Sequence, residues 1–212
     1  MSTVLTQRLK KAGYGAYIDP IEELISAGEL AQVDALLRPL IGDLPLRGVE
    51  IPPSSLQSRE YTGLDLRGLT VQGERGSMKL KAVAFTNCDL SEASFAGVFR
   101  EDDDKYWPMQ VEAQFDSCDL TGFEFEGVKV GAIHLRNCYV RDDREPVEFV
   151  QCRFISNGYA TLKVAGKALP LKLSGVTSRG KLPLILVTQE LFEAQVGMIS
   201  SNVDYGVYPV HR

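Results

Sequence analysis

Residues suited to acid–base or nucleophilic chemistry are few in this chain of 212 residues, which has only two histidines, His134 and His211. A Ser–His–acid or Cys–His arrangement would have to use His134, but no nucleophile stands in a recognisable motif around it. Neither a Walker A sequence nor G-x-G-x-x-G is present, so a nucleotide site has no sequence support. We therefore predict no catalytic residues, no cofactor and no enzymatic activity.

The four cysteines also indicate structure rather than chemistry. They are isolated in the sequence, at Cys88, Cys118, Cys138 and Cys152. Zinc sites usually contain closely spaced C-x-x-C pairs, and this chain has none. Small buried thiols explain the four residues, so we predict reduced core cysteines.

An acidic segment followed by aromatic residues is the strongest candidate for binding. Glu101 to Asp104 are consecutive carboxylates, but calcium loops alternate their ligands, so we predict no metal site. The only tryptophan of the chain follows, and exposed aromatic side chains are typical binding anchors. Two alternatives to a binding role are that the acidic segment is a solvated loop and that Trp107 folds back and covers a face of the solenoid. The predicted partner-binding residues are Asp102, Asp103, Asp104, Tyr106, Trp107 and Met109.

The charge distribution supports a basic protein partner. The net charge of −5 conceals −7 within residues 60–160, and residues 101–126 contain nine acidic residues and one basic residue, Lys105. Nucleic-acid binding needs a basic surface, so we predict no direct contact with nucleic acid. If the segment at 101–109 is not the site, the alternative acidic face consists of Glu112, Asp116, Glu124 and Glu126.

Large apolar residues recur at every fifth position between residues 115 and 140. A second apolar ladder runs two residues ahead of the first. On an α-helix, side chains five residues apart would point in all directions around the axis. On a strand, they would point alternately to opposite faces. Both ladders can face one core only if the chain bends every five residues, as in a solenoid. The ladders are Phe115, Leu120, Phe125, Val130, Leu135 and Val140, and Ala113, Cys118, Phe123, Val128, Ile133 and Cys138.

The best repeat units read Cys88-Asp89-Leu90-Ser91-Glu92 and Cys118-Asp119-Leu120-Thr121-Gly122. Over about residues 64–159 the pattern resembles the pentapeptide-repeat family. The resemblance implies a mainly β fold, a right-handed quadrilateral β-helix with four repeats in each coil. Cys118 and Cys138 should then stack on successive coils. Cys88 should belong to the same column if an insertion adds a net ten residues to its coil. An irregular β-sandwich is the alternative.

The remaining segments divide the chain into four parts. Residues 1–45 read as a small α-helical unit, with Asp19 and Pro20 starting one helix and Pro39 ending the next. Its expected role is to cap the solenoid, with an independent binding domain as the alternative. Residues 46–63 read as a connector and residues 64–160 as the β-helix, with an insertion at 99–112. Residues 161–212 read as a C-terminal segment of strands, a helix at 189–196 and an apolar tail.

Two functions remain open. The first is a protein-interaction or adaptor module that binds through the insertion and an adjoining side of the β-helix. The second, implied by the resemblance, is a DNA mimic that inhibits or protects a type II topoisomerase such as DNA gyrase, or another DNA-binding protein. No apolar stretch reaches the roughly 20 residues that span a bilayer, and the first residues lack a signal-peptide core, so we expect a cytoplasmic protein. The apolar tail leaves a homodimer through the C-terminal segment open.

Overall fold

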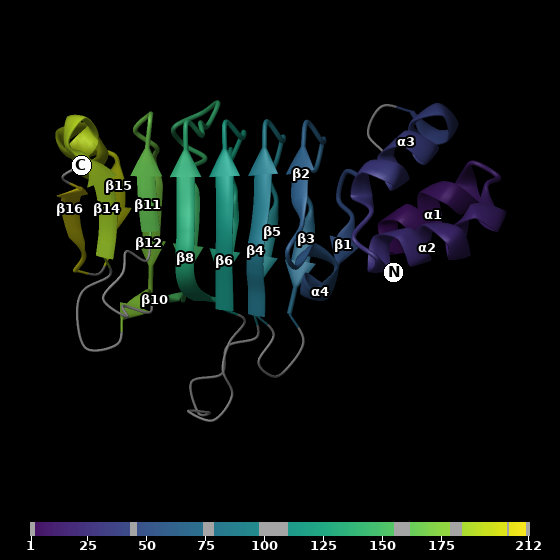
Figure 1. Ribbon diagram of the computed structural model, residues 1–212, viewed down its shortest axis with the longest axis horizontal. Coiled ribbons are helices and arrows are strands. Elements are labelled where there is room, and N and C mark those ends of the chain that lie inside the picture. Colours follow the sequence, from purple (N-terminus) through teal and green to yellow (C-terminus); the bar gives the residue numbers. More distant parts are fainter. Residues whose placement is uncertain are drawn as a thin grey trace, which may run out of the picture.

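The computed structural model describes residues 3–42, 46–73, 79–97, 110–154, 162–178, 184–202 and 204–210. The chain winds into a right-handed parallel β-solenoid, with helices at its N-terminal end (Figure 1). Sheet A stacks β1 (Glu50–Ile51), β3 (Thr70–Gln72), β5 (Ser94–Ala96), β7 (Glu124–Glu126), β9 (Val147–Val150), β12 (Leu171–Ser174) and β15 (Ile199–Ser201). Sheet B stacks β2 (Glu60–Thr62), β4 (Lys79–Thr86), β6 (Gln110–Asp116), β8 (Lys129–Arg136), β11 (Leu162–Ala165), β14 (Leu184–Thr188) and β16 (Gly206–Val210).

Two narrower sides complete the predicted quadrilateral cross-section. On one, Asp65, Asp89, Asp119 and Tyr139 pair as successive parallel bridges. On the other, β10 (Arg153–Phe154) pairs with β8 and with β13 (Thr177–Ser178). Each coil therefore has four sides, and all the strand pairs are parallel.

The cysteine column confirms the predicted stacking. Asp119 pairs with Tyr139 and with Asp89, so the cysteines that precede these three residues occupy equivalent positions on three coils. Thirty residues separate the paired Thr86 and Asp116, whereas twenty separate Asp116 and Arg136. The coil that contains the insertion is thus ten residues longer, as the stacking of Cys88 requires. All four cysteines are buried and free.

The two apolar ladders line the core. Every member is buried except Val140, which is partly buried against it. Because neighbouring coils are in register, aromatic rings stack from coil to coil: the ring centroids of Phe85 and Phe115 are 5.4 Å apart, and those of Phe125 and Phe149 are 4.8 Å apart. These distances match the spacing of hydrogen-bonded strands, about 4.8 Å.

Corners with a left-handed backbone explain the five-residue step. Asn87, Ser117 and Asn137 follow equivalent strands of sheet B, and all have φ between 52° and 56°. Gly63 and Gly166 take the same place on other coils. Glycine and asparagine adopt positive φ more readily than most residues. These five strands of sheet B can therefore end in a sharp turn that redirects the chain onto the next side.

The N-terminal unit contains α1 (Thr3–Lys11), η1 (Gly15–Tyr17), α2 (Ile18–Ser26) and α3 (Leu30–Ile41). The prediction of Asp19 as a helix cap was wrong: α2 begins at Ile18 directly after η1, and its N-cap residue, Tyr17, makes no side-chain cap bond. Pro39 does not end α3 but lies inside it, in the last turn. Pro39 removes one helical amide donor, but only two residues of the helix follow it, so the effect is confined to the end of α3.

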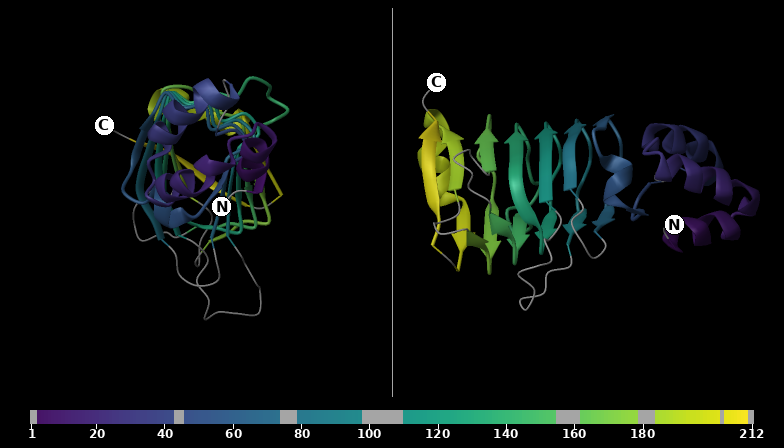
Figure 2. Two further views of the ribbon diagram at one scale, coloured as in Figure 1. Left: turned by 90° about the vertical axis from the view of Figure 1, so that its right-hand side faces the viewer. Right: turned by 60° about the horizontal axis from the view of Figure 1, so that its bottom comes forward.

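Polar contacts dock this unit onto the first coil. The Tyr61 hydroxyl donates to the carbonyl oxygens of Gly28 (3.0 Å) and Ser55 (3.3 Å), and burial raises its pKa to about 12. Arg59 pairs with Glu29 at 2.9 Å. Apolar residues of the helices and of the solenoid belong to one continuous core. The helices cover the N-terminal end of the solenoid (Figure 2), in agreement with the expected capping role.

The solenoid extends beyond the predicted limits of 64 and 160. Residues 46–63 are not a connector, because β1 and β2 pair with β3 and β4, with α4 (Pro53–Leu56) between them. β11, β12 and β14 to β16 continue the two sheets, with η2 (Gln189–Leu191) and α5 (Phe192–Gly197) between β14 and β15. The five-residue ladder fades there because Leu162 pairs with Ile133 and with Ile185, at intervals that are not multiples of five.

Truncation of the core ladder tests this fold. Phe115→Ala or Phe125→Ala should each lower the free energy of unfolding by about 3–5 kcal/mol, because a buried ring leaves a cavity. Leu120→Ala should lower it by about 2–5 kcal/mol. Glu126→Ala, at an exposed position, should change it by less than about 0.5 kcal/mol. Urea denaturation measures all four, and equal losses at buried and exposed positions would contradict the assigned core.

Two glycines form a matched test of the docked helical unit. Gly13 and Gly28 both have positive φ, but a Cβ on Gly13 would meet no atom within 4 Å, whereas one on Gly28 would lie 2.0 Å from the Ser55 carbonyl oxygen. Gly13→Ala should cost about 1 kcal/mol from backbone strain alone. Gly28→Ala should cost at least about 2 kcal/mol and speed amide exchange in α2 and α3. Equal costs would mean that the close contact does not hold the unit in place.

Candidate functional site

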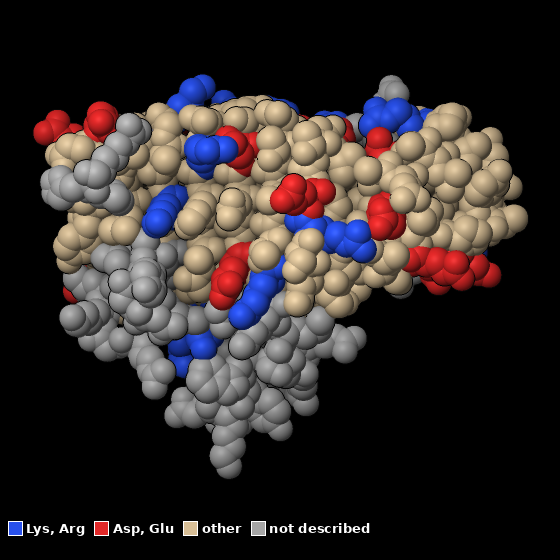
Figure 3. All heavy atoms as spheres, in the orientation of Figure 1, with Lys and Arg blue, Asp and Glu red and all other residues tan. Residues whose placement is uncertain are grey.

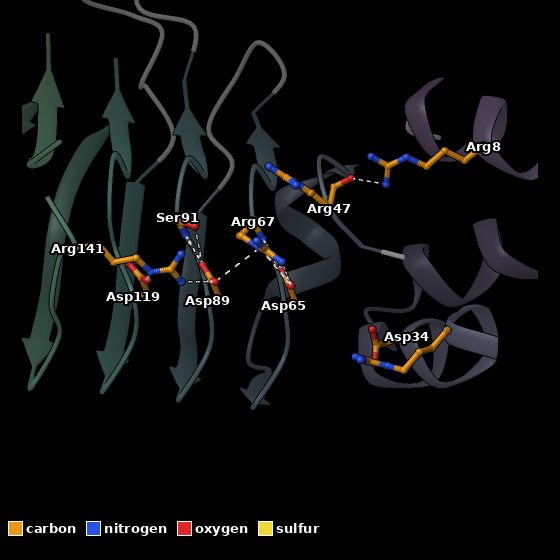
Figure 4. Close-up of polar contacts among 10 residues, drawn as sticks. Arg8, Asp34, Arg47, Asp65, Arg67, Asp89, Ser91, Asp119 and Arg141 are labelled. Carbon is orange, nitrogen blue, oxygen red and sulfur yellow. Dashed lines mark hydrogen bonds and ion pairs between the residues drawn. The ribbon is translucent and has the colours of Figure 1, made fainter. Parts of the chain in front are cut away.

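A row of alternating acidic and basic side chains follows the narrow side that carries the parallel bridges. We call it the corner ladder: Asp65, Arg67, Asp89, Arg141 and Asp119 (Figure 4). Arg67 pairs with Asp65 at 2.6 Å and reaches Asp89 on the next coil at 3.6 Å. Arg141 comes from the opposite direction and pairs with Asp89 at 2.7 Å and, through its Nε, with Asp119. The two arginines thus converge on Asp89.

Local hydrogen bonds orient the carboxylates of the corner ladder. One oxygen of Asp89 accepts from the Ser91 amide at 3.1 Å and the Ser91 hydroxyl at 2.6 Å. Asp119 accepts in the same way from Thr121, at 3.0 and 2.5 Å. Burial alone would raise the pKa of Asp89, but the bonds from Ser91 and the Arg141 guanidinium hold it below its usual value. Both carboxylates have an arginine partner on a neighbouring coil, an arrangement that stabilises the coils rather than one that awaits a ligand.

The outer side of sheet B carries a second compensated pair. Asp116 pairs with Arg136, which lies twenty residues later on the adjacent coil, and this guanidinium lowers the pKa of Asp116. His134 lies between Gln114 and Lys163 in register, on the outer side as predicted, and burial together with Lys163 lowers its pKa. Figure 3 shows the molecule from the side of sheet B, as Figure 1 does. On this face, acidic and basic side chains are interspersed with uncharged ones.

Negative charge is less compensated on sheet A. Glu124 pairs in register with Glu148, and Glu126 follows on the same strand as Glu124. Lys172 pairs with Glu148 at 2.9 Å and is the one cation among these four side chains. Burial raises the pKa of Glu124, and the charges of Glu126 and Glu148 raise it further, against an opposing effect of Lys172. This part of sheet A therefore favours an incoming positive charge.

The predicted site residues fall into three places. Asp102, Asp103, Asp104, Tyr106, Trp107 and Met109 lie outside the described residues. Glu112 and Asp116 are on β6 of sheet B, whereas Glu124 and Glu126 are on β7 of sheet A. The four residues of the alternative acidic face therefore do not share one face: two belong to each sheet, and Asp116 is paired with Arg136.

One contact links the acidic part of sheet A to the insertion. Gly97, the last described residue before position 110, donates its amide to the carbonyl oxygen of Glu126 at 2.8 Å. A Cβ on Gly97 would lie 2.6 Å from the Gly127 carbonyl oxygen, so the two coils approach closely here. The last described residue before the insertion therefore lies beside the backbone of Glu126.

All four cysteines are buried in the core. Cys152 is buried, its Sγ lies 3.1 Å from the Phe125 carbonyl oxygen, and burial raises its pKa to about 12. Over the described residues, no group of three or more His, Cys, Asp and Glu side chains could hold a metal ion. The described helices also include none that is long and apolar enough to cross a membrane.

Sequence reasoning missed Arg67, Arg141, Glu148 and Lys172. A signal for Arg141 was present, because it lies twenty residues after Thr121 and donates its amide to that hydroxyl at 2.8 Å. The Asp-x-Ser and Asp-x-Thr triplets of the two best repeat units also marked the bonds within the corners. Glu148 and Lys172 had no such signal, because the coils that contain them are not twenty residues long.

Comparison with models of known protein families, with curated proteins and with solved structures found no match to this chain. The resemblance to the pentapeptide-repeat family therefore stays a prediction. The β-solenoid fold is typical of structural and interaction proteins.

Two arginines test the role of the corner ladder. Arg141→Ala would leave the carboxylate of Asp119, only 1% exposed, without its cation. We expect the free energy of unfolding to fall by about 2 kcal/mol, less than for a fully buried pair because Arg141 is half exposed. Arg136→Ala, which breaks an exposed pair on sheet B, should cause a clearly smaller loss.

The double variant Arg141→Ala/Asp119→Asn provides the control, because an amide at position 119 needs no counter-charge and can still accept from Thr121. It should regain part of the stability lost in Arg141→Ala. Chemical denaturation at neutral pH measures each variant. No recovery in the double variant would show that Arg141 acts through packing rather than through its charge.

Proposed function

We propose that this protein is a non-enzymatic protein-interaction module. It binds a basic partner through the insertion and the adjoining acidic part of sheet A, formed by Glu124, Glu126 and Glu148. The observation that carries the proposal is the backbone hydrogen bond between Gly97 and Glu126, because it places the last described residue before the insertion beside a residue of that acidic group. Both predicted elements, an acidic aromatic segment and an acidic side of the β-helix, then contribute to one surface.

Electrostatics supports this choice of side. The carboxylates of the corner ladder and Asp116 already have arginine partners, so a cationic partner would gain little from them. Glu124 and Glu126 carry no ion pair among the described residues, and the pKa of Glu124 is raised first by burial and then by repulsion from Glu126 and Glu148. A lysine or arginine of a partner placed there would relieve that repulsion. Such contacts mainly increase the association rate.

The DNA-mimic alternative rests on the acidic run at 101–126. A mimic of the phosphate backbone has to present many uncompensated negative charges along its length. On the described surface, the paired carboxylates alternate with arginines, which opposes this alternative (Figure 4). A DNA gyrase supercoiling assay separates the two functions: we expect no inhibition and no protection by the purified chain.

The proposal is tested with a partner captured from the native host and then purified. Trp107→Ala should weaken its binding by about 2 kcal/mol or more and leave the melting temperature unchanged, as for an exposed anchor. Glu124→Gln/Glu126→Gln should slow association and reduce its dependence on salt. Glu60 is an exposed carboxylate on sheet B, and Glu60→Gln is the matched control. It should change neither the association rate nor its dependence on salt.

Two results would contradict the proposal. Loss of stability in Trp107→Ala without loss of affinity would make the tryptophan a structural cover. Equal effects of the Glu60 and the Glu124/Glu126 variants would mean that the charge of the whole molecule, and not this side of sheet A, attracts the partner.

A further inference from the structure

The residues that open the solenoid repeat the backbone of the later corners on the same narrow side. In four successive corners, one amide donates to the carbonyl oxygen three positions earlier at 3.0–3.2 Å, as Val49 donates to Leu46. The residue before each of these amides has φ between 60° and 67°. Gly48 also donates to the Arg67 carbonyl oxygen on the next coil at 2.8 Å. The residues that occupy equivalent places in the four corners are Arg47, Arg67, Ser91 and Thr121.

In three of these corners, an aspartate caps the amide two residues later. The carboxylates of Asp65, Asp89 and Asp119 accept from those amides at 3.3, 3.1 and 3.0 Å. In the sequence, the residue two positions before Arg47 is Pro45, which supplies no carboxylate. Among the described residues, none accepts a hydrogen bond from the Arg47 amide. The first corner therefore repeats the backbone of the other three without their acceptor.

The first corner also concentrates positive charge. The Arg47 side chain is partly exposed, and no described carboxylate forms an ion pair with it. On the next coil, both oxygens of Asp65 accept from the Arg67 guanidinium, at 2.6–3.2 Å. From the helical unit, Arg8 donates to the Arg47 carbonyl oxygen at 2.8 Å, which holds a second guanidinium against this corner (Figure 4). An uncapped amide and two guanidiniums thus lie together at the junction of the helical unit and the solenoid.

We propose that the first corner binds a carboxylate group of a ligand, in the place that an aspartate fills in the next three corners. The carboxylate belongs to an aspartate or glutamate side chain of a partner protein or to a free carboxylic acid. One of its oxygens accepts from the Arg47 amide, and the Arg47 guanidinium binds it from the side, as Arg67 binds Asp65. Hydrogen bonds between charged groups are stronger than neutral ones, and arginine matches the planar shape of a carboxylate.

This site differs from the proposed interaction surface in both place and charge. It lies on a narrow side beside the helical unit, whereas Glu124, Glu126 and Glu148 lie on sheet A. It attracts a negative group, whereas that part of sheet A attracts a positive one. The proposed carboxylate site therefore does not rest on the proposed function, and each can fail without the other.

Nuclear magnetic resonance of the full chain, titrated with sodium acetate, tests the proposal. As acetate replaces chloride at constant ionic strength, the Arg47 amide proton should move downfield and saturate. The dissociation constant should be about 1–50 mM, a range suited to a ligand of so few atoms. The amides of Arg67, Ser91 and Thr121 are internal controls that should not move, because their acceptors are already in place.

Two short peptides separate the sources of the carboxylate. Acetyl-Gly-Asp-Gly-amide should shift the Arg47 amide as acetate does, and its Asn counterpart should not. Binding of both acetate and the Asp peptide would indicate a site open to free acids. Binding of the Asp peptide alone would indicate a site for the side chain of a partner. Both results support the proposal.

Variants of Arg47 test the role of its guanidinium. Arg47→Gln keeps the backbone amide and should weaken acetate binding at least about fivefold, whereas Arg47→Lys, which keeps the charge, should lose less. Arg136→Gln changes an exposed arginine of sheet B and should leave the binding unchanged. Thermal melting shows that each variant is folded.

Four results would overturn the proposal. The first is an Arg47 amide that does not respond to acetate or to the Asp peptide. The second is an equal shift of the amides of Arg67, Ser91 and Thr121, which would indicate a general effect of the anion. The third is equal binding of the Asp and Asn peptides, and the fourth is unchanged binding in Arg47→Gln.

Discussion

The structure depends on one constraint: each coil must return to the position from which it started, one strand spacing farther along the axis. Only then do the backbone hydrogen bonds of two parallel sheets form together and the inward side chains stack. The aromatic column of Tyr61, Phe85 and Phe115, with ring centroids 5.5 and 5.4 Å apart, shows how closely the register is kept. Burial of these rings supplies the main driving force for the stack.

The same register turns sequence offsets into neighbours. Arg141 meets Asp119 and Asp89 because all three occupy one narrow side of successive coils. Extra residues are accommodated between the sides, where they leave the register of the strands intact. The coil before Asp116 contains ten extra residues, and the segment from Arg141 to Pro146 lengthens a later coil, yet Phe125 still pairs with Phe149. Insertions at corners can therefore carry new surface features at little cost to the core.

This division of labour accounts for the distribution of charge. Carboxylates at corners are used within the molecule, where they bind local amides and hydroxyls and meet arginines of neighbouring coils. On the flat side of sheet A, Glu124 and Glu126 have no ion pair among the described residues, and burial together with the charges of Glu126 and Glu148 raises the pKa of Glu124. A rigid solenoid thus keeps one set of charges for its own stability and leaves another for a partner, which is the physical basis of the proposed interaction surface.

The amino-acid sequence by itself determined the solenoid and its buried cysteines, because a five-residue apolar step can face one core in no simpler way. Its four sides were implied by the resemblance to the pentapeptide-repeat family. It did not determine where the solenoid begins and ends: β2 and β11 to β16 join it through coils whose lengths are not multiples of five, so pairing rather than local pattern includes them. The distribution of Glu112, Asp116, Glu124 and Glu126 over two sheets, and the convergence of Arg67 and Arg141 on Asp89, were decided by the tertiary structure alone. The physical reason is that long-range register, set by the packing of the whole coil, chooses the neighbours of each charged side chain.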